Sequence, residues 1–136
     1  MLHSVYFGYS LDGYALPAGT VLTYDRIISN VGGYYNPVTG AFLCPVNGIY
    51  MFSLTVTAGV GSGMYRAYAW IYKDDNTLSY VWALDKSGTQ EYASGTTVVV
   101  TECAAGTRVW TAVAFDSVFS SFHHSNQFSG FLITSY

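Results

Sequence analysis

A two-residue alternation of apolar and polar side chains limits what this chain can fold into more than any other feature. Between residues 49 and 57, every even position carries a large apolar residue, and Ser or Thr fills the odd positions from 53 onward. Successive side chains of an extended chain point to opposite sides, so this run places apolar residues on one face and hydroxyls on the other. The pattern predicts a β-strand with one buried face.

Similar runs recur along the sequence, and turn-forming clusters such as Asn36-Pro37, Asn47-Gly48 and Asp74-Asp75-Asn76 separate them. No window combines a helix cap with a 3.6-residue period. Further strands are predicted near residues 3–9, 20–24, 66–73, 78–84, 96–101, 107–115 and 127–134. Short strands at this spacing predict an all-β antiparallel sandwich or barrel.

Size and composition fit one domain with a neutral surface. The 136 residues correspond to a single domain, 1–136, and 51% of them are apolar, which is enough to build a core. Only 10% are charged, against roughly 25% in a usual soluble domain, and 18% are aromatic. A surface of Tyr, Ser, Thr and Gly is expected of an oligomer, of a protein that binds neutral polar ligands, or of both.

Three functional classes are disfavoured. The net charge is −3 and the five cations are scattered, so we expect no nucleic-acid partner. The charge-free stretch 27–65 is interrupted repeatedly by Gly and Pro, so we expect no membrane insertion. We find no nucleophile beside a base, no paired carboxylates and no Gly-x-Ser-x-Gly motif, so we predict that the protein is not an enzyme.

The chain has two cysteines, Cys44 and Cys103, which allow at most one disulfide. A disulfide requires the two Cα atoms to lie within about 7 Å, and the sequence does not give that distance. Free thiols in the core and a disulfide between them therefore both stay open at this stage.

Residues 24–54 resemble the signature of the C1q globular domain. That signature has an aromatic residue, an Asn or Asp six residues on, an aromatic or Leu five further and a Phe seven further, followed by Gly-x-Tyr-x-Phe-x-aromatic. The matching positions are Tyr24, Asn30, Tyr35, Phe42, Gly48, Tyr50, Phe52 and Leu54. Tyr24 replaces the usual Phe and Leu54 the usual aromatic, and both keep the bulk. The segments 93–95, 106–110 and 128–133 are also similar to the family in order and spacing.

This resemblance implies a ten-stranded antiparallel jelly roll of the C1q and tumour necrosis factor type, assembled as a homotrimer. The aromatic signature positions are expected to fill the core, because each ring removes about 150–250 Å² from water. The predicted core residues are Tyr35, Phe42, Tyr50, Phe52, Phe128 and Phe131. The sequence contains no collagen-like Gly-x-y region, and in this it resembles the head-only members of the family found in invertebrates.

The resemblance also implies a function. We expect a secreted, extracellular and non-enzymatic recognition protein that binds glycans or microbial surface ligands. The alternative is a receptor-binding or matrix-forming ligand that acts through protein contacts. The polar and aromatic residues of two predicted turns are the candidate ligand contacts: Tyr72, Asp74, Asp75 and Asn76 in one turn, and His123, His124 and Asn126 in the other.

A calcium site is a further expectation that comes from the resemblance. Some vertebrate members hold calcium at the top of the trimer through carboxylates in the loop that matches residues 85–91. Asp85 and Glu91 are the candidate ligands here, since a threefold axis would multiply two carboxylates into six. A solvated loop without any metal is the competing interpretation. We expect no other cofactor.

Overall fold

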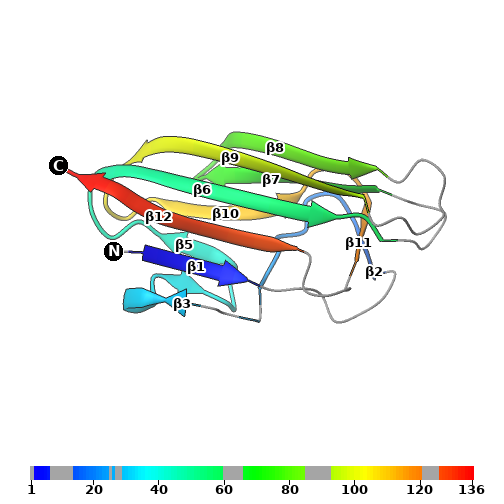
Figure 1. Ribbon diagram of the computed structural model, residues 1–136, viewed down its shortest axis with the longest axis horizontal. Coiled ribbons are helices and arrows are strands. Elements are labelled where there is room, and N and C mark those ends of the chain that lie inside the picture. Colours follow the sequence, from blue (N-terminus) through cyan, green and yellow to red (C-terminus); the bar gives the residue numbers. More distant parts are fainter. Residues whose placement is uncertain are drawn as a thin grey trace.

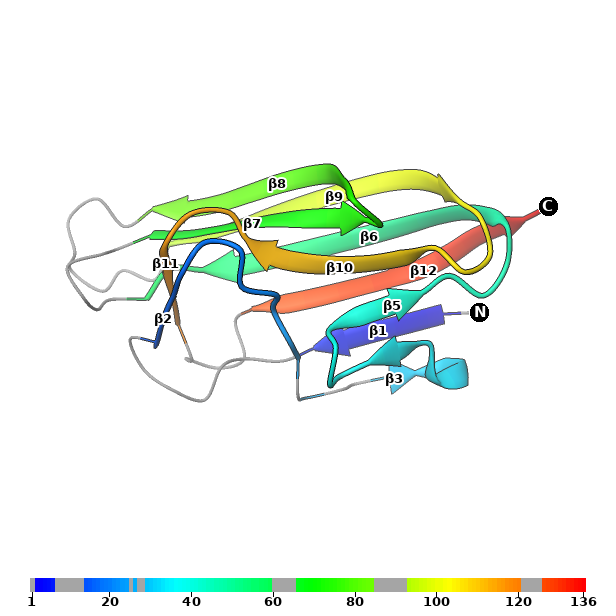
Figure 2. The same ribbon diagram turned by 180° about the vertical axis from the view of Figure 1, so that it is seen from behind.

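Two antiparallel sheets pack face to face in this protein. The computed structural model describes residues 2–6, 14–24, 26, 29–59, 66–84, 93–120 and 126–136. The first sheet has the order β3-β1-β12-β6-β9, with β1 Leu2–Tyr6, β3 Ser29–Asn30, β6 Gly48–Thr57, β9 Ser94–Cys103 and β12 Gln127–Ser135. The second has the order β4-β5-β10-β7-β8, with β4 Tyr35–Asn36, β5 Ala41–Leu43, β7 Arg66–Lys73, β8 Asn76–Leu84 and β10 Arg108–Val113. Figure 1 shows the first sheet in front, and Figure 2 shows the second.

Two minor elements complete the described chain. A small third sheet joins β2 Tyr14–Leu16 to β11 Ser117–Phe119, and a short 3-10 turn covers Val31–Gly33. Strand β1 pairs antiparallel with β12, so the earliest and latest strands are neighbours and both chain ends lie at one end of the sandwich (Figure 1). This double sheet confirms the predicted all-β jelly roll. Among the described residues, no helix has the length and apolar character that a membrane span needs.

The long predicted strands are present, and one short prediction is wrong. The runs at 49–57, 66–73, 78–84, 96–101 and 127–134 all lie within observed strands. Residues 20–24 instead form only an isolated bridge, in which Val21 pairs with Ala112 of β10. Leu22 and Tyr24 are nevertheless buried. Leu22 and Tyr24 therefore point inward as in a strand, although the segment 20–24 makes too few ladder hydrogen bonds to form one.

Aromatic rings fill the space between the sheets. Phe52 of β6 is fully buried, with ring centroids 6.1 Å from Tyr50, 6.2 Å from Phe128 and 5.6 Å from Phe42. Tyr35 completes this cluster at 6.3 Å from Phe128. The structure thus buries five of the six predicted core residues, and their burial drives the packing of the two sheets.

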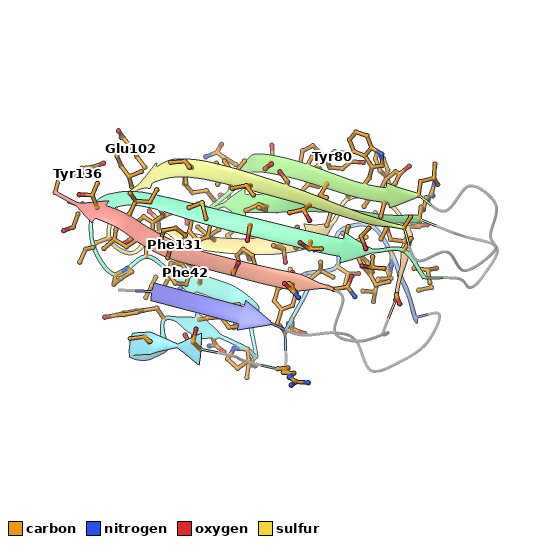
Figure 3. All side chains as sticks on the ribbon, in the orientation of Figure 1. Phe42, Tyr80, Glu102, Phe131 and Tyr136 are labelled. Carbon is orange, nitrogen blue, oxygen red and sulfur yellow. The ribbon has the colours of Figure 1, made fainter. Side chains whose placement is uncertain are left out.

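Phe131 is the exception among the predicted core residues. It is only half-buried and pairs with Met51 on the outer side of the first sheet. The inward position beside it belongs to Gly130, where a Cβ atom would collide with the ring of Phe52. Because neighbouring residues of a strand alternate, a glycine that faces the core turns the next ring outward. Figure 3 labels Phe131 and the buried Phe42.

Candidate functional site

Strand β7 turns its aromatic residues away from the core. Ala67, Ala69 and Ile71 are fully buried, whereas the alternating positions Tyr68 and Trp70 are only partly buried. The opposite sheet already fills the interior with the large rings of β6 and β12, so β7 has room only for small or branched residues on its inner side. The rings of β7 are therefore displayed on the outer face of the second sheet.

The neighbouring strands β8 and β10 add further rings to the same outer face. The rings of Tyr72 and Trp110 stack at 5.6 Å with planes 9° apart, and the centroids of Trp70 and Tyr80 lie 4.6 Å apart. Tyr80 also contacts two other rings, and Figure 3 labels it on β8. We call this surface the aromatic face; its residues are Tyr68, Trp70, Tyr72, Tyr80, Trp82, Trp110 and Phe115.

The rings of the aromatic face differ in their exposure and pack against one another. Trp82 is 58% exposed and Phe115 is 53% exposed, while the remaining rings are partly buried against one another. The guanidinium carbon of Arg66 lies 5.6 Å from the centroid of the Tyr68 ring, a cation–π contact. Because most of these side chains stand on paired strands and contact each other, they lose little conformational freedom when a ligand binds.

A cleft of about 360 Å³ lies beside the aromatic face. Strand β10 links the two features, since Arg108 lines the cleft and Trp110, two residues on, points to the same side of the sheet. The lining mixes polar and apolar groups: Gly33, Tyr34, Asn36, Thr39, Ala41, Leu43 and Arg108. Hydroxyl, amide and guanidinium groups are thus available next to the flat ring surfaces.

The turn between β7 and β8 borders the same region. Asp74 has a left-handed φ of 50°, its Oδ1 accepts a 3.0 Å hydrogen bond from the Arg108 amide, and its own amide donates to the Arg108 carbonyl at 2.8 Å. Asp75 and Asn76 are exposed beside it. The structure therefore brings four predicted ligand residues, Tyr72, Asp74, Asp75 and Asn76, next to the cleft. Their contact with a ligand stays a prediction.

Asn126 is wrongly predicted as an exposed ligand contact. Its side chain is 2% exposed, accepts a 2.9 Å hydrogen bond from the Thr57 amide and donates one of 2.6 Å to the Ser120 carbonyl. An amide that satisfies two backbone groups in the interior has a structural role. It also lies at the Thr57 end of β6, whereas the β7–β8 turn lies near the opposite end, where Lys73 bonds the carbonyl of Glu102.

The other predicted site residues lie outside the described residues. This holds for His123 and His124, and for the calcium candidates Asp85 and Glu91. In the part of the chain that the structure describes, no three His, Cys, Asp or Glu side chains gather in a way that could hold a metal ion. Calcium binding therefore stays a prediction of the sequence.

Most of the aromatic face was missed by sequence reasoning. The alternation in residues 66–73 identifies two sides of a strand without saying which side is buried. The small residues of β7 are a signal that could have identified the outward-facing side. The residues between the rings of β7 include Ala67 and Ala69, which fit tightly against a crowded core, whereas three large rings would not.

Two facing antiparallel sheets with the earliest and latest strands paired define a jelly-roll domain of the C1q and tumour necrosis factor class. Comparison with known proteins makes this more specific. A family model described as the C1q domain matches residues 10–133, so the chain belongs to the C1q domain family. Trimeric assembly is typical of this family.

Sequence relatives and solved structures agree with this assignment. Complement C1q tumor necrosis factor-related protein 2 of Mus musculus is 30% identical over 124 residues, which cover 82% of this chain and 37% of that protein. The Homo sapiens protein of the same name is also 30% identical, over 82% of this chain and 38% of its own length. The chain thus spans less than two fifths of these relatives.

The fold is similar to that of two solved structures. The globular domain of zebrafish complement 1qA protein has a TM-score of 0.76 and 16% identity over 99% of this chain and 98% of its own. Eiger TNF from S. frugiperda has a TM-score of 0.67 and 11% identity over 98% of this chain and 95% of its own. At these identities the similarity concerns the fold alone.

Proposed function

We propose that this protein is an extracellular, non-enzymatic recognition protein that binds neutral glycans on its aromatic face as a homotrimer. The observation that carries the proposal is a row of partly exposed rings, with Tyr72 and Trp110 beside a cleft of mixed polar and apolar lining. Contiguous exposed apolar surface on a soluble protein commonly marks a binding site. Membership of the C1q domain family supports a recognition role outside the cell.

Sugar chemistry matches both parts of this surface. One side of a pyranose ring presents C–H groups, which pack against the electron-rich face of an aromatic ring. Its hydroxyls require hydrogen-bond partners, and Asn36, Thr39 and Arg108 line the cleft with such groups. A single sugar chain could therefore stack on Trp110 and Tyr72 while its neighbouring unit donates and accepts hydrogen bonds in the cleft.

The charges around the site favour a neutral ligand. Asp74 and Asp75 lie at the turn beside Arg108, and the whole chain carries a net charge of −3. Such a mixture gives no strong attraction for an anion. We therefore place neutral polysaccharides of microbial or host surfaces ahead of acidic ones.

The outer side of the first sheet has the character of a subunit interface. We call it the aliphatic face; its residues are Met51, Val98, Val100 and Phe131. Val98 and Val100 are 56% and 58% exposed in the single chain. The hydroxyls beside them are paired, since Ser53 and Ser129 bond at 2.7 Å and Thr55 and Thr96 at 2.8 Å. Apolar surface with satisfied polar groups is suited to burial against a copy of the chain.

Trimer formation through the aliphatic face would leave the aromatic face free, because the two lie on opposite outer sides of the sandwich. Three identical sites on one rigid scaffold gain avidity when a ligand repeats on a cell surface. Even millimolar single-site affinity, about −4 kcal/mol, then supports attachment.

A glycan array followed by titration in solution tests this function. The protein, tagged away from the aromatic face, is applied to immobilised neutral and acidic oligosaccharides, and soluble versions of the bound sugars are titrated while tryptophan fluorescence is recorded. We expect binding of neutral sugars with a change in emission, since Trp110 and Trp82 belong to the proposed site. Silence on the array, together with capture of a defined protein receptor, would favour the receptor-binding alternative.

A further inference from the structure

The two cysteines meet inside the sandwich. Cys44 follows β5 of the second sheet and is fully buried, and Cys103 ends β9 of the first sheet and is 4% exposed. Both belong to the hydrophobic core. The two thiols are close enough to shift each other's pKa, raising that of Cys44 and lowering that of Cys103. The two side chains therefore lie near each other in the core between the two sheets.

Backbone hydrogen bonds hold this contact independently of the thiols. The Cys44 amide donates to the Thr107 carbonyl at 2.8 Å, and the Gly106 amide donates to the Cys44 carbonyl at 2.9 Å. Thr107 lies only four residues after Cys103, which is itself paired with Gly48 in the β6–β9 ladder. Cys44 is thus anchored from two directions to the turn that Cys103 begins.

The local chemistry suits thiol oxidation. The hydrogen bond from Cys44 lowers the pKa of Cys103, and the nearby Lys73 ammonium lowers it further. Lys73 is fixed there by hydrogen bonds of 3.1 Å to Thr101 Oγ1 and 3.0 Å to the Glu102 carbonyl. The same contact and burial raise the pKa of Cys44. Cys103 is therefore the more acidic of the two thiols, which makes it the better nucleophile of the pair.

We propose that Cys44 and Cys103 form an intrachain disulfide during oxidative folding of this protein, with a disulfide such as oxidised glutathione as the oxidant. The Cys103 thiolate attacks one sulfur of glutathione disulfide, forms a mixed disulfide and expels one glutathione thiolate. The Cys44 sulfur then attacks the Cys103 sulfur, forms the protein disulfide and expels the second glutathione. The two cysteine protons end on the two released thiolates. Two protein thiols are oxidised by two electrons, and one glutathione disulfide is reduced.

This disulfide would connect the two sheets near the end that holds the cleft. It closes a loop of about 60 residues, and constraint of a long loop in the unfolded chain is the main source of disulfide stabilisation. Because both sulfurs are buried once the sandwich has closed, the exchange occurs while the sheets are still assembling. The inference rests on the extracellular location in the proposed function and is independent of glycan binding.

Mass spectrometry of the folded protein provides the primary test. The full chain is refolded in a buffer of reduced and oxidised glutathione whose redox potential matches that of the secretory pathway. It is then denatured, alkylated without reduction and digested. We expect a protein lighter by two hydrogens than its reduced form, no alkylated cysteine, and one linked peptide pair containing Cys44 and Cys103. Two alkylated cysteines under these conditions would overturn the proposal.

Melting temperatures of the oxidised and reduced protein test whether the disulfide stabilises the fold, and a variant without cysteines is the control. Reduction of the oxidised wild-type protein is expected to lower its melting temperature by roughly 10 °C. The double variant Cys44→Ala, Cys103→Ala should show no change with reductant, so a similar drop in that variant would contradict the assignment. Should the double variant fail to fold, the peptide map of the wild-type protein still decides. A sugar-binding assay of both forms separates failure of this inference from failure of the proposed function.

Discussion

The outer sides of the two sheets are both apolar, and they are apolar in different ways. The aliphatic face presents Val and Met side chains among Ser and Thr hydroxyls that bond to each other. The aromatic face presents flat rings, several with polar tips, beside a cleft that contains an arginine. A surface whose hydroxyls bond to each other is suited to permanent burial, whereas rings next to polar groups are suited to a ligand that is itself half polar.

The difference shows that hydrophobicity alone does not describe a surface of this kind. Val100 and Trp82 have the same exposed fraction, 58%, and nevertheless belong to surfaces with opposite expected partners. Two properties distinguish the surfaces. One is the shape of the side chains, branched or flat, and the other is whether the nearby polar groups are already hydrogen-bonded to each other. Equivalent substitutions on the two faces can therefore test whether one face mediates assembly and the other binds ligand.

The largest effect is expected from the core that supports both faces. Phe52→Ala should lower the free energy of unfolding by about 3–5 kcal/mol, because it leaves a cavity among rings that are fully buried. Chemical denaturation followed by circular dichroism measures this loss. Val38→Ala, at a position 84% exposed, is the control and should change stability by less than about 0.5 kcal/mol. Equal stability of both variants would mean that Phe52 is not a core residue.

The second prediction separates the two faces by assembly. Val100→Asp should convert the trimer to monomers of 14.8 kDa, since three carboxylates would otherwise be buried without partners. Light scattering across a concentration series gives the mass. Trp82→Asp is the matched control, because it adds the same charge at the same exposure on the other face, and it should stay trimeric. The reverse outcome would exchange the roles of the faces, and a monomeric wild-type protein would rule out the trimer.

The third prediction separates the faces by ligand binding. Trp110→Ala should weaken glycan affinity at least about tenfold, because it removes a ring on which the sugar stacks and also leaves Tyr72 without its neighbour. Titration calorimetry with the sugar identified on the array measures the change. Tyr136→Ala removes a ring that is 71% exposed and lies outside the aromatic face, so its affinity should match the wild-type protein. Equal loss in both variants would place the site elsewhere.

The smallest effect concerns pH. Burial raises the pKa of Tyr35 above its ordinary value, while its hydrogen bond from the Tyr24 amide partly opposes the shift. A group whose pKa is raised on folding contributes stability below its unfolded pKa, here about 10, and loses that contribution as the pH rises further. Melting temperatures should therefore fall above pH 10. In Tyr35→Phe the decline should be shallower, at the cost of about 1 kcal/mol near neutral pH from the lost hydrogen bond. An unchanged slope would contradict this role of Tyr35.

The sequence predicted the strands that are long enough to show their two-residue alternation over several repeats. Strands β6 and β7 contain ten and eight residues, so their two-residue period is visible over several repeats. Strands β3 and β4 contain two residues each and exist because longer neighbours position them, so no local pattern could reveal them. The core aromatics of β6 were predicted for the same reason as the strand itself.

The candidate site was harder to predict because it depends on which side of a strand meets the other sheet. Phe128 and Phe131 are three residues apart, so a regular strand places them on opposite faces, and the contact of Gly130 with Phe52 shows that Phe131 is the one that faces outward. Asn126 is polar and follows a pair of histidines, so it resembles a loop residue, yet its hydrogen bonds to Thr57 and Ser120 place it in the interior. Long-range packing decides both cases, and one sequence does not contain it.

The antiparallel pairing of β1 with β12 also has a mechanical consequence. Leu2 is paired with Phe131 and Tyr6 with Gln127, so a force that pulls the two chain ends apart opens this ladder one hydrogen bond at a time from Leu2 inward. A ligand held at the cleft lies at the same end of the sandwich as both chain ends, so a force between the ligand and one chain end acts across the two sheets and does not pull β1 away from β12. A domain attached by one chain end should therefore keep the β1–β12 ladder intact under a load that would open it if the domain were stretched between its two ends.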